Sequence, residues 1–440
     1  MRFFAVVMIA TTCFVAEASA LQDQVFNVVA KTRTSLYSGR TPIATVEKGE
    51  VMTVVDNQQN SYYVHASGER KGWLSQGAVA RLKDSLQIYN DLIRQTPNRA
   101  AHYEARALVW WTLGDIDRLV ADYGSAIKLG SKNPSVFNNR AIHLATQGQY
   151  DQAILDYTNA IKFGAKGPGV YINRGVAHFG KKDYDKAIAD YDQAVKLGAT
   201  GYSVLGNRAA AKAASGDLVH AVDDYTLAIK QEPKNPTAYH SRGLAWRDLE
   251  NYKQAATDFS EALRFDPKFT KAFMSRGFVY FLSDQPDKAV KDFTSALALD
   301  PNNALAINNR GYNYQLMGKY AEAVKDYRQA VRLAPKYALA YQNIAWLLAT
   351  CPEDKIRNGK EALKSALEAC KLREYQVATD VKSLAAAYAE NGDFEKALHW
   401  QKKVLELMEE ADDERKKEES EFIKRYEEKK PFRFSLEKKK

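Results

Sequence analysis

The stretch 173–194, which reads NRGVAHFGKKDYDKAIADYDQA, carries the pattern that the rest of the chain repeats. Sixteen residues after its Arg comes an Asp, then an aromatic residue, and three residues further on an Ala. Steps of 34 residues find this set seven times. A pattern that keeps its phase for so long indicates a repeat architecture. Its members are Arg106, Arg140, Arg174, Arg208, Arg242, Arg276 and Arg310; Asp122, Asp156, Asp190, Asp224, Asp258, Asp292 and Asp326; Tyr123, Tyr157, Tyr191, Tyr225, Phe259, Phe293 and Tyr327; and Ala126, Ala160, Ala194, Ala228, Ala262, Ala296 and Ala330.

Each period predicts two helices joined by a short turn. Small and aromatic residues at helical spacing mark two amphipathic segments, 171–179 and 184–197 in one repeat. Glycines at one shared phase are expected to end the first helix in a left-handed turn, and prolines at another phase to stop the second. One hairpin cannot bury its apolar face alone, so the hairpins must stack. The glycines are Gly114, Gly148, Gly216 and Gly318, the prolines are Pro233, Pro267, Pro301 and Pro335, and Gly130, Gly164 and Gly198 end the second helix in the early repeats.

This pattern resembles the tetratricopeptide repeat, which has a small residue in its first helix, aromatic and Ala positions in its second, and a closing Pro. The resemblance covers residues 101–408. It implies a mainly α protein: an α-solenoid of about nine hairpins wound as a right-handed superhelix, acting as a protein-protein interaction scaffold. In one repeat the matching residues are Gly243, Tyr252, Ala255, Phe259, Ala262 and Pro267.

The chain departs from the family pattern just before the small residue. The family has Leu there, whereas seven units here have Arg, and the last two return to Ile344 and Leu384. These two residues stand 40 positions apart instead of 34. We therefore expect an insertion near 350–360 that forms a longer loop between two helices.

Seven cations and seven anions in register allow two interpretations. In one, the arginines line a concave groove and grip acidic partners. In the other, which we favour, each Arg replaces a packing Leu and must be satisfied by an Asp of the same or the adjacent hairpin. On this interpretation we predict that Asp190→Ala destabilises the protein far more than Arg174→Leu.

The position one residue before the Arg is the better candidate for binding. Asn occupies it in five repeats, and Ser241 and Ser275 occupy it in two others. In the family this face of the first helix is concave, and Asn side chains there can hydrogen-bond the backbone of an extended peptide. The alternative is that these are solvated residues in the first turns of helices. The candidate groove residues are Asn139, Asn173, Asn207, Asn309 and Asn343, with Phe179, Arg247 and Phe281 as anchors further along the same face.

The arrangement by which some family members clamp a terminal carboxylate is not matched. Ile142, Val176 and Ala210 stand where a polar clamp residue would be needed. That specificity is therefore not expected here.

The first 20 residues resemble a secretory leader. Arg2, the apolar run 3–15 and the small-residue site at 18–20 form a signal peptide, so we expect export to the periplasm or outside the cell. A lipoprotein anchor at Cys13 and a buried N-terminal helix are the alternatives. No later apolar run approaches the roughly 20 residues that span a bilayer, so no membrane insertion is expected after cleavage.

Residues 21–82 predict a small all-β domain, because short β-branched or aromatic runs alternate with glycines. Its motifs, ending in Gly-Trp-Leu at 72–74, resemble the bacterial SH3-like domain, which implies a module that binds cell-wall material or peptides. Tyr62, Tyr63 and Trp73 either line a ligand groove or, as we favour, Trp73 and one tyrosine fill the core. Residues 83–100 are expected to form a capping and linker helix between this domain and the array.

The ends and the cysteines complete the organisation. Residues 409–440 predict the charged end of the last helix and a basic, disordered tail that includes the run 429–434. Cys351 and Cys370 are either free or bridged, and their expected separation on antiparallel helices favours free thiols.

Composition and motifs argue against a catalytic, metal or cofactor site. The seven histidines fall at different phases without metal-ligand spacing, and there is no phosphate loop, nucleophile elbow or dinucleotide fingerprint. We predict no catalytic residue, metal or cofactor. A net charge of +9 from 63 basic and 54 acidic residues is mild and mixed, so no nucleic-acid partner is expected.

These features together predict an exported, non-catalytic scaffold or adaptor that holds a protein or peptide in the concave face of the array. One alternative is a cell-wall (peptidoglycan) binding protein that acts through the SH3-like domain. Another is an accessory or regulatory subunit of an enzyme.

Overall fold

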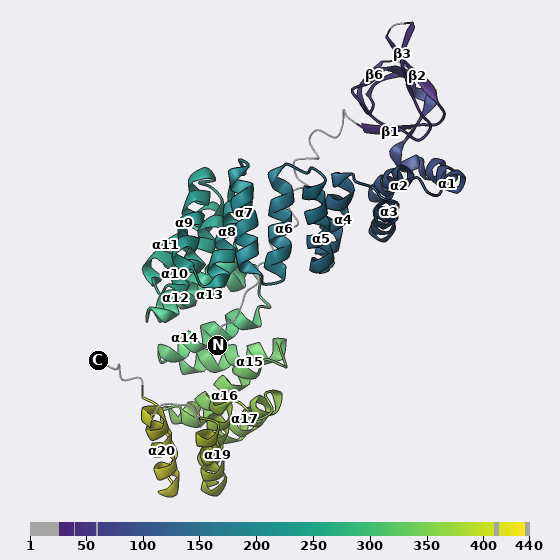
Figure 1. Cartoon of the computed structure of the whole chain (residues 1–440). Coiled ribbons are helices and arrows are strands. Elements are labelled where there is room, and N and C mark those ends of the chain that lie inside the picture. The colour runs from purple at the N-terminus through teal and green to yellow at the C-terminus, as the bar shows by residue number, and fades with distance from the viewer. Residues whose placement is uncertain (1–25, 39, 59, 409–412, 436–440) are drawn as a thin grey trace. The chain divides into compact units, whose positions relative to one another are not determined.

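The structure is a computed structural model that describes residues 26–38, 40–58, 60–408 and 413–435. The expected leader at 1–20 lies outside these residues. The chain divides into two compact units, with the boundary in the sequence between Asp217 and Leu218. The first unit holds an antiparallel sheet and the early helices, and the second is helical (Figure 1). The mainly α fold with a small all-β region before it is confirmed.

Seven antiparallel strands form one sheet in the order β3-β2-β6-β5-β4-β1-β7, which curls into a barrel-like shape (Figure 1). Its core is aliphatic and includes Leu36, Met52 and Leu74. Tyr62 packs against this core, whereas Trp73 lies on the opposite face of its strand from Leu74. The expectation that Trp73 fills the core is therefore wrong. The strands are β1 (Phe26–Ala30), β2 (Thr34–Ser38), β3 (Thr41–Val46), β4 (Val51–Gln58), β5 (Ser61–His65), β6 (Lys71–Ser75) and β7 (Val79–Arg81).

Helix α1 joins the sheet to the first hairpin. It follows two 3-10 turns, η1 (Gln76–Ala78) and η2 (Leu82–Asp84). Tyr89 of α1 is fully buried and packs with residues of β1, η2 and α2. The Tyr89 hydroxyl donates a hydrogen bond to the Gly49 carbonyl oxygen at 3.0 Å. The sheet and the first helices thus share one core.

The helices of the first unit form antiparallel hairpins, α2 with α3, α4 with α5 and α6 with α7, and neighbouring hairpins pack together. The left-handed turns expected at glycine are confirmed at Gly114 and Gly216, which cap α2 and α8 with φ of 75° and 99°. The helices are α1 (Leu86–Gln95), α2 (Ala100–Leu113), α3 (Ile116–Lys128), α4 (Pro134–Thr146), α5 (Tyr150–Lys162), α6 (Pro168–Gly180), α7 (Tyr184–Lys196) and α8 (Tyr202–Ser215).

The second unit continues with five hairpins, from α10 with α11 to α18 with α19. The prolines stop the second helices as expected, since α9, α11, α13 and α15 each end two residues before one. The helices are α9 (Leu218–Gln231), α10 (Pro236–Asp248), α11 (Tyr252–Phe265), α12 (Thr270–Leu282), α13 (Pro286–Leu299), α14 (Ala304–Leu316), α15 (Tyr320–Leu333), α16 (Ala338–Thr350), α17 (Gly359–Leu372), α18 (Ala378–Glu390), α19 (Phe394–Glu406) and α20 (Asp413–Glu427).

The small residue of each repeat lets an aromatic ring of the second helix approach closely. A Cβ added at Gly175 would stand 2.7 Å from Cε1 of Tyr191, and one at Gly243 would stand 2.7 Å from Cε1 of Phe259. Both rings are buried. The repeated Gly and aromatic positions therefore form one packing contact inside each hairpin.

The insertion forms a longer loop, as expected. It runs between α16 and α17 and contains one 3-10 turn, η3 (Asp354–Ile356). Arg357 fixes the loop by donating to the Cys351 carbonyl oxygen at 2.9 Å and pairing with Glu390 at 3.1 Å. Cys351 and Cys370 are both buried and free.

The C-terminal segment differs from the expected disordered tail. Residues 431–435 pack against α16 and the end of α18, with Phe432 and Phe434 in contact with aromatic side chains. The basic run suggested solvation, but the two phenylalanines supply apolar surface that the array covers. Among the described helices, none has the length and apolar character to cross a membrane.

Candidate peptide-binding groove

The repeated arginines form ion pairs within the array and are not a free recognition surface. Nε of Arg174 donates to Asp190 Oδ2 at 2.9 Å, and Nη2 donates to Asp190 Oδ1 at 2.6 Å. The hydrogen bond to Asp190 raises the pKa of Arg174 above its usual value. The predicted pairing within one hairpin is confirmed in six repeats. The pairs are Arg106–Asp122, Arg140–Asp156, Arg174–Asp190, Arg242–Asp258, Arg276–Asp292 and Arg310–Asp326.

The third guanidinium nitrogen reaches the helix that directly precedes the Arg-bearing helix in the chain. Arg174 Nη1 donates to Thr158 Oγ1 at 3.2 Å, and Arg276 Nη1 donates to Ser260 Oγ at 2.9 Å. Each such Arg therefore ties three helices together. This contact was not predicted from the sequence, because the partner sixteen residues before the Arg varies in type. The other members are Arg106 with Asn90, Arg208 with Asp192, Arg242 with Thr226 and Arg310 with Thr294.

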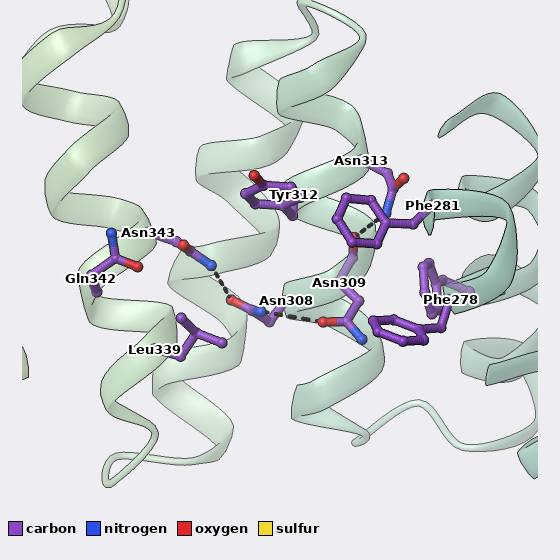
Figure 2. A pocket seen from close by; sticks show the side chains of 10 residues that line it. Phe278, Phe281, Asn308, Asn309, Tyr312, Asn313, Leu339, Gln342 and Asn343 are labelled. Carbon is purple, nitrogen blue, oxygen red and sulfur yellow. Dashed lines mark hydrogen bonds between the residues drawn. The ribbon is translucent and has the colours of Figure 1, made fainter. Parts of the chain in front are cut away.

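A groove of about 240 Å³ opens in the second unit where α12, α14 and α16 lie side by side (Figure 2). One wall is aromatic and comes from α12 and α14, and the other is formed by the amide side chains of α14 and α16. The lining residues are Phe278, Phe281, Phe293, Asn308, Asn309, Tyr312, Asn313, Leu339, Gln342 and Asn343.

The amides of the groove hold one another in a fixed chain (Figure 2). Asn343 Nδ2 donates to Asn308 Oδ1 at 2.9 Å, and Asn308 Nδ2 donates to Asn309 Oδ1 at 3.5 Å. Asn313 Nδ2 donates to the Asn309 carbonyl oxygen at 2.8 Å. Because these donors are already used, the orientations of the Asn308, Asn313 and Asn343 amides are set before any ligand arrives.

Among these groove amides, the side-chain oxygen of Asn313 is buried without a hydrogen-bond partner. Asn313 is 2% exposed, and among the described residues no donor bonds to its Oδ1. An unpaired buried carbonyl costs about 1–3 kcal/mol. An N–H group of a ligand could pair with this oxygen once the side chains that cover it shift.

The aromatic wall offers apolar surface beside these amides. Phe281 stacks edge-on against Tyr312, with ring centroids 5.5 Å apart, and lies 5.9 Å from Phe278. Phe278, Tyr312 and Leu339 each leave more than a third of their surface exposed. Large apolar side chains exposed together around a concave surface are typical of a binding site.

The structure separates the predicted groove residues into two sets. Phe281, Asn309 and Asn343 come together in this groove. Arg247 instead pairs with its neighbour Asp248 at 2.7 Å. The remaining candidates, Asn139, Asn173, Phe179 and Asn207, all lie in the first unit.

Two of the candidates in the first unit have local contacts. Asn139 Nδ2 donates weakly to the Tyr123 hydroxyl at 3.5 Å, and Phe179 packs on Tyr184 with ring centroids 5.5 Å apart. They contribute no part of the groove described above.

Most of the groove residues that were not predicted from the sequence stand at three phases. Asn308 and Gln342 stand two residues before the Arg position, Phe278 and Tyr312 two residues after it, and Asn313 three after it. Aromatic residues at a phase that elsewhere holds Ile142 or Val176 were the available signal.

The described histidines do not form a metal site, since no group of three His, Cys, Asp or Glu side chains gathers anywhere in the described ranges. His240 is buried, and its Nε2 lies 3.1 Å from Ser275 Oγ. Burial, with Lys271 nearby, lowers the pKa of His240 to about 4. This histidine is therefore a neutral core residue at physiological pH.

On the sheet, an aromatic row crosses three strands. Trp73 of β6 stands opposite Tyr37 of β2 and Tyr63 of β5, and directly opposed residues share one face of a sheet. The Tyr63 and Trp73 rings lie 5.2 Å apart. Of the three predicted aromatic residues, Tyr62 thus supports the core, while Tyr63 and Trp73 belong to this surface row.

Comparisons with known proteins agree on the repeat. Models of the tetratricopeptide repeat match residues 168–198, 207–268, 270–303, 304–337 and 383–411. No curated protein sequence is significantly similar to the chain.

Several solved structures are similar at low sequence identity. MamA is 23% identical, with 38% of this chain and 95% of MamA covered and a TM-score of 0.35. Yeast Tom70 is 15% identical, with 79% and 92% covered and a TM-score of 0.40. The C-terminal part of a TPR repeat-containing protein from Cytophaga hutchinsonii is 18% identical, with 56% and 98% covered and a TM-score of 0.48. Tetratricopeptide repeats are therefore confirmed within residues 168–411 of this chain.

Proposed function

We propose that this protein is an exported, non-catalytic adaptor that holds an extended segment of a partner protein in the groove of α12, α14 and α16. Tetratricopeptide repeats make the chain a protein-protein interaction scaffold. The leader-like residues 1–20 support export to the periplasm or the exterior. The ligand is a peptide because the groove combines backbone-reading amides with an apolar wall.

The observation that carries this proposal is the unpaired Asn313 Oδ1 beside the aromatic wall. An extended peptide presents a backbone N–H that can donate to this oxygen once the side chains that cover it shift, whatever the peptide's own side chains are. Its apolar side chain would cover the exposed edges of Phe278 and Tyr312. Specificity for sequence would then come from the aromatic wall, and affinity for peptide backbone from the amides.

The test is a selection of random dodecapeptides on the immobilised full chain, followed by titration of the selected peptides. In Asn313→Leu the acceptor is lost, while Leu347 shows that this phase accepts Leu in another repeat. We expect at least about tenfold weaker binding, because a buried hydrogen bond is removed. The matched control, Asn173→Ala in the first unit, should bind normally. Equal affinity for Asn313→Leu and wild type would refute the proposed site.

A second candidate function rests on the aromatic row of Tyr37, Tyr63 and Trp73. We propose that the sheet is an SH3-like module whose row stacks on cell-wall glycan, since flat aromatic faces bind sugar rings and other apolar surfaces. The full chain should sediment with purified wall material, and Trp73→Ala should remain in the supernatant. Asn313→Leu should sediment normally, so this experiment separates the two sites. Sedimentation of Trp73→Ala at the wild-type level would reject the row as the binding surface.

A further inference from the structure

The chain turns back after α20 and places a short extended segment on the array. Lys429 adopts a left-handed conformation with φ of 57°, and the chain then runs without helix from 430 to 435. Its backbone bonds to the array as a bound peptide would, since the Phe434 N–H donates to the Thr350 carbonyl oxygen at 3.1 Å. We call residues 431–435 the tail segment.

Two aromatic contacts hold the ends of the tail segment. The Phe432 ring lies 5.8 Å from Trp346 of α16 and 4.6 Å from Phe422 of α20. The Phe434 ring stands edge-on to Tyr320 of α15, at 5.6 Å. The surface under the tail segment therefore has two separate aromatic subsites.

An ion pair holds the middle of the tail segment. Arg433 Nη2 lies 2.6 Å from Glu390 Oε2, and Nη1 donates to the Ala349 carbonyl oxygen at 3.2 Å. The Glu390 side chain is only 14% exposed, so this charge pair is largely shielded from water. Its other oxygen, Oε1, pairs with Arg357 at 3.1 Å, so Glu390 lies between two guanidinium groups. Pairing between a guanidinium and a shielded carboxylate favours Arg over any neutral residue at this position.

The same face carries the groove in the neighbouring repeats. Trp346 stands at the phase of Phe278 and Tyr312, two residues after the Arg position. Phe278 and Tyr312 are exposed, whereas Trp346 is covered by the tail segment. The array thus shows one aromatic face, part open and part filled by a segment of its own chain.

Helix α20 is held independently of the tail segment. Glu419 pairs with Lys382 at 2.6 Å and accepts from Gln401 Nε2 at 2.8 Å, and Tyr426 is fully buried. The tail segment adds two half-buried rings, one ion pair, the Arg433 hydrogen bond to the Ala349 carbonyl oxygen and one backbone bond to the array. It can therefore leave its place while α20 stays folded on α19.

We infer that Tyr320, Trp346, Thr350, Glu390 and Phe422 form a second peptide site, specific for an extended aromatic-cation-aromatic segment. In this chain Phe432, Arg433 and Phe434 occupy it in cis. A partner protein that carries the same pattern binds there by replacing the tail segment. This site adjoins the groove along α16 but shares no lining residue with it, and its occupancy does not depend on the groove binding a peptide.

The test uses a fluorescein-labelled peptide with the sequence of residues 430–435 and a chain that ends at Lys430. Fluorescence anisotropy should show saturable binding to the shortened chain. The full chain should bind at least about tenfold more weakly, because a tethered segment competes at an effective concentration near the millimolar range. A peptide with Ser at both phenylalanine positions should not bind. Asn313→Leu should leave this binding unchanged.

Glu390→Gln in the shortened chain supplies the charge control. It should weaken the Arg-containing peptide about tenfold and leave a peptide with Gln at the Arg433 position unaffected. If the shortened chain does not fold, as judged by circular dichroism, the full chain with Phe432→Ser and Phe434→Ser replaces it. Equal peptide affinity for the full and opened chains, or no binding to a folded opened chain, would overturn the inference.

Discussion

Removing one partner of the Arg174–Asp190 pair measures how much one of the repeated Arg–Asp pairs contributes to stability. The Asp190 side chain is 7% exposed and that of Arg174 is 21% exposed. Arg174→Leu leaves the more buried charge without its two donors. Asp190→Ala leaves a guanidinium that touches water and keeps Thr158. From these exposures we expect Arg174→Leu to cost more than Asp190→Ala, the opposite order to the prediction made from the sequence.

Breaking a buried ion pair costs roughly 3–5 kcal/mol. We expect Arg174→Leu near the upper end of this range and Asp190→Ala near about 3 kcal/mol, because solvent screens the exposed guanidinium. The double variant removes both charges, so it should cost at least about 1 kcal/mol less than the sum of the single changes.

Hydrogen exchange of peptides from α6 and α7 is the suitable assay, because repeat arrays unfold locally and not as one two-state unit. The exposed pair of Lys403 and Glu406 provides the control, and Glu406→Ala should leave exchange unchanged. The reasoning is refuted if Asp190→Ala lowers the local free energy of opening more than Arg174→Leu, or if the two costs simply add.

Three further predictions concern packing, pH and thiols. Gly243→Ala should lower stability by about 1–3 kcal/mol, since the added Cβ would press on the Phe259 ring. Gly124→Ala is the control and should not lower it, because the nearest atom to its Cβ would be 3.5 Å away. Thermal melts compare the two variants. Burial lowers the pKa of His240 to about 4, so between pH 6.5 and 4 the unfolded chain binds a proton that the folded chain does not. The free energy of unfolding should therefore fall by up to about 3 kcal/mol over this range, and His240→Gln should abolish that fall in urea titrations. Burial raises the pKa of the Cys370 thiol to about 12, so Ellman's reagent should label it only after unfolding, and labelling of the native chain would contradict this.

The period of 34 residues made the hairpins and the Arg–Asp pairs predictable. Both depend on contacts at a fixed offset within one repeat, which a single sequence displays. The contact from Arg174 to Thr158 was missed because Thr, Ser, Asn and Asp all serve there. A hydrogen bond that several residue types can make leaves no regular mark on the sequence.

The groove was only partly predictable, for a different reason. The phase of Asn309 and Asn343 was identified, but it recurs in repeats where no such groove is described. The groove arises where amides at that phase meet Phe278 and Tyr312 from neighbouring helices. This coincidence between adjacent repeats is visible only once their helices are packed.

The tail segment was wrongly expected to be solvated. That expectation rested on the lysines at 429 and 430. It gave too little weight to Phe432 and Phe434, which stand on either side of Arg433. Their burial depends on Trp346 and Tyr320, which lie more than 80 residues earlier in the chain. No local pattern could connect them.

The central claim, that the groove of α12, α14 and α16 binds an extended peptide, is tested most directly by photo-crosslinking. A selected peptide would carry benzoylphenylalanine at its apolar position, and mass spectrometry would locate the crosslink on the full chain. We predict attachment to Phe278, Phe281 or Tyr312, and loss of that attachment in Asn313→Leu. Crosslinks confined to the first unit, or unchanged by Asn313→Leu, would contradict the account.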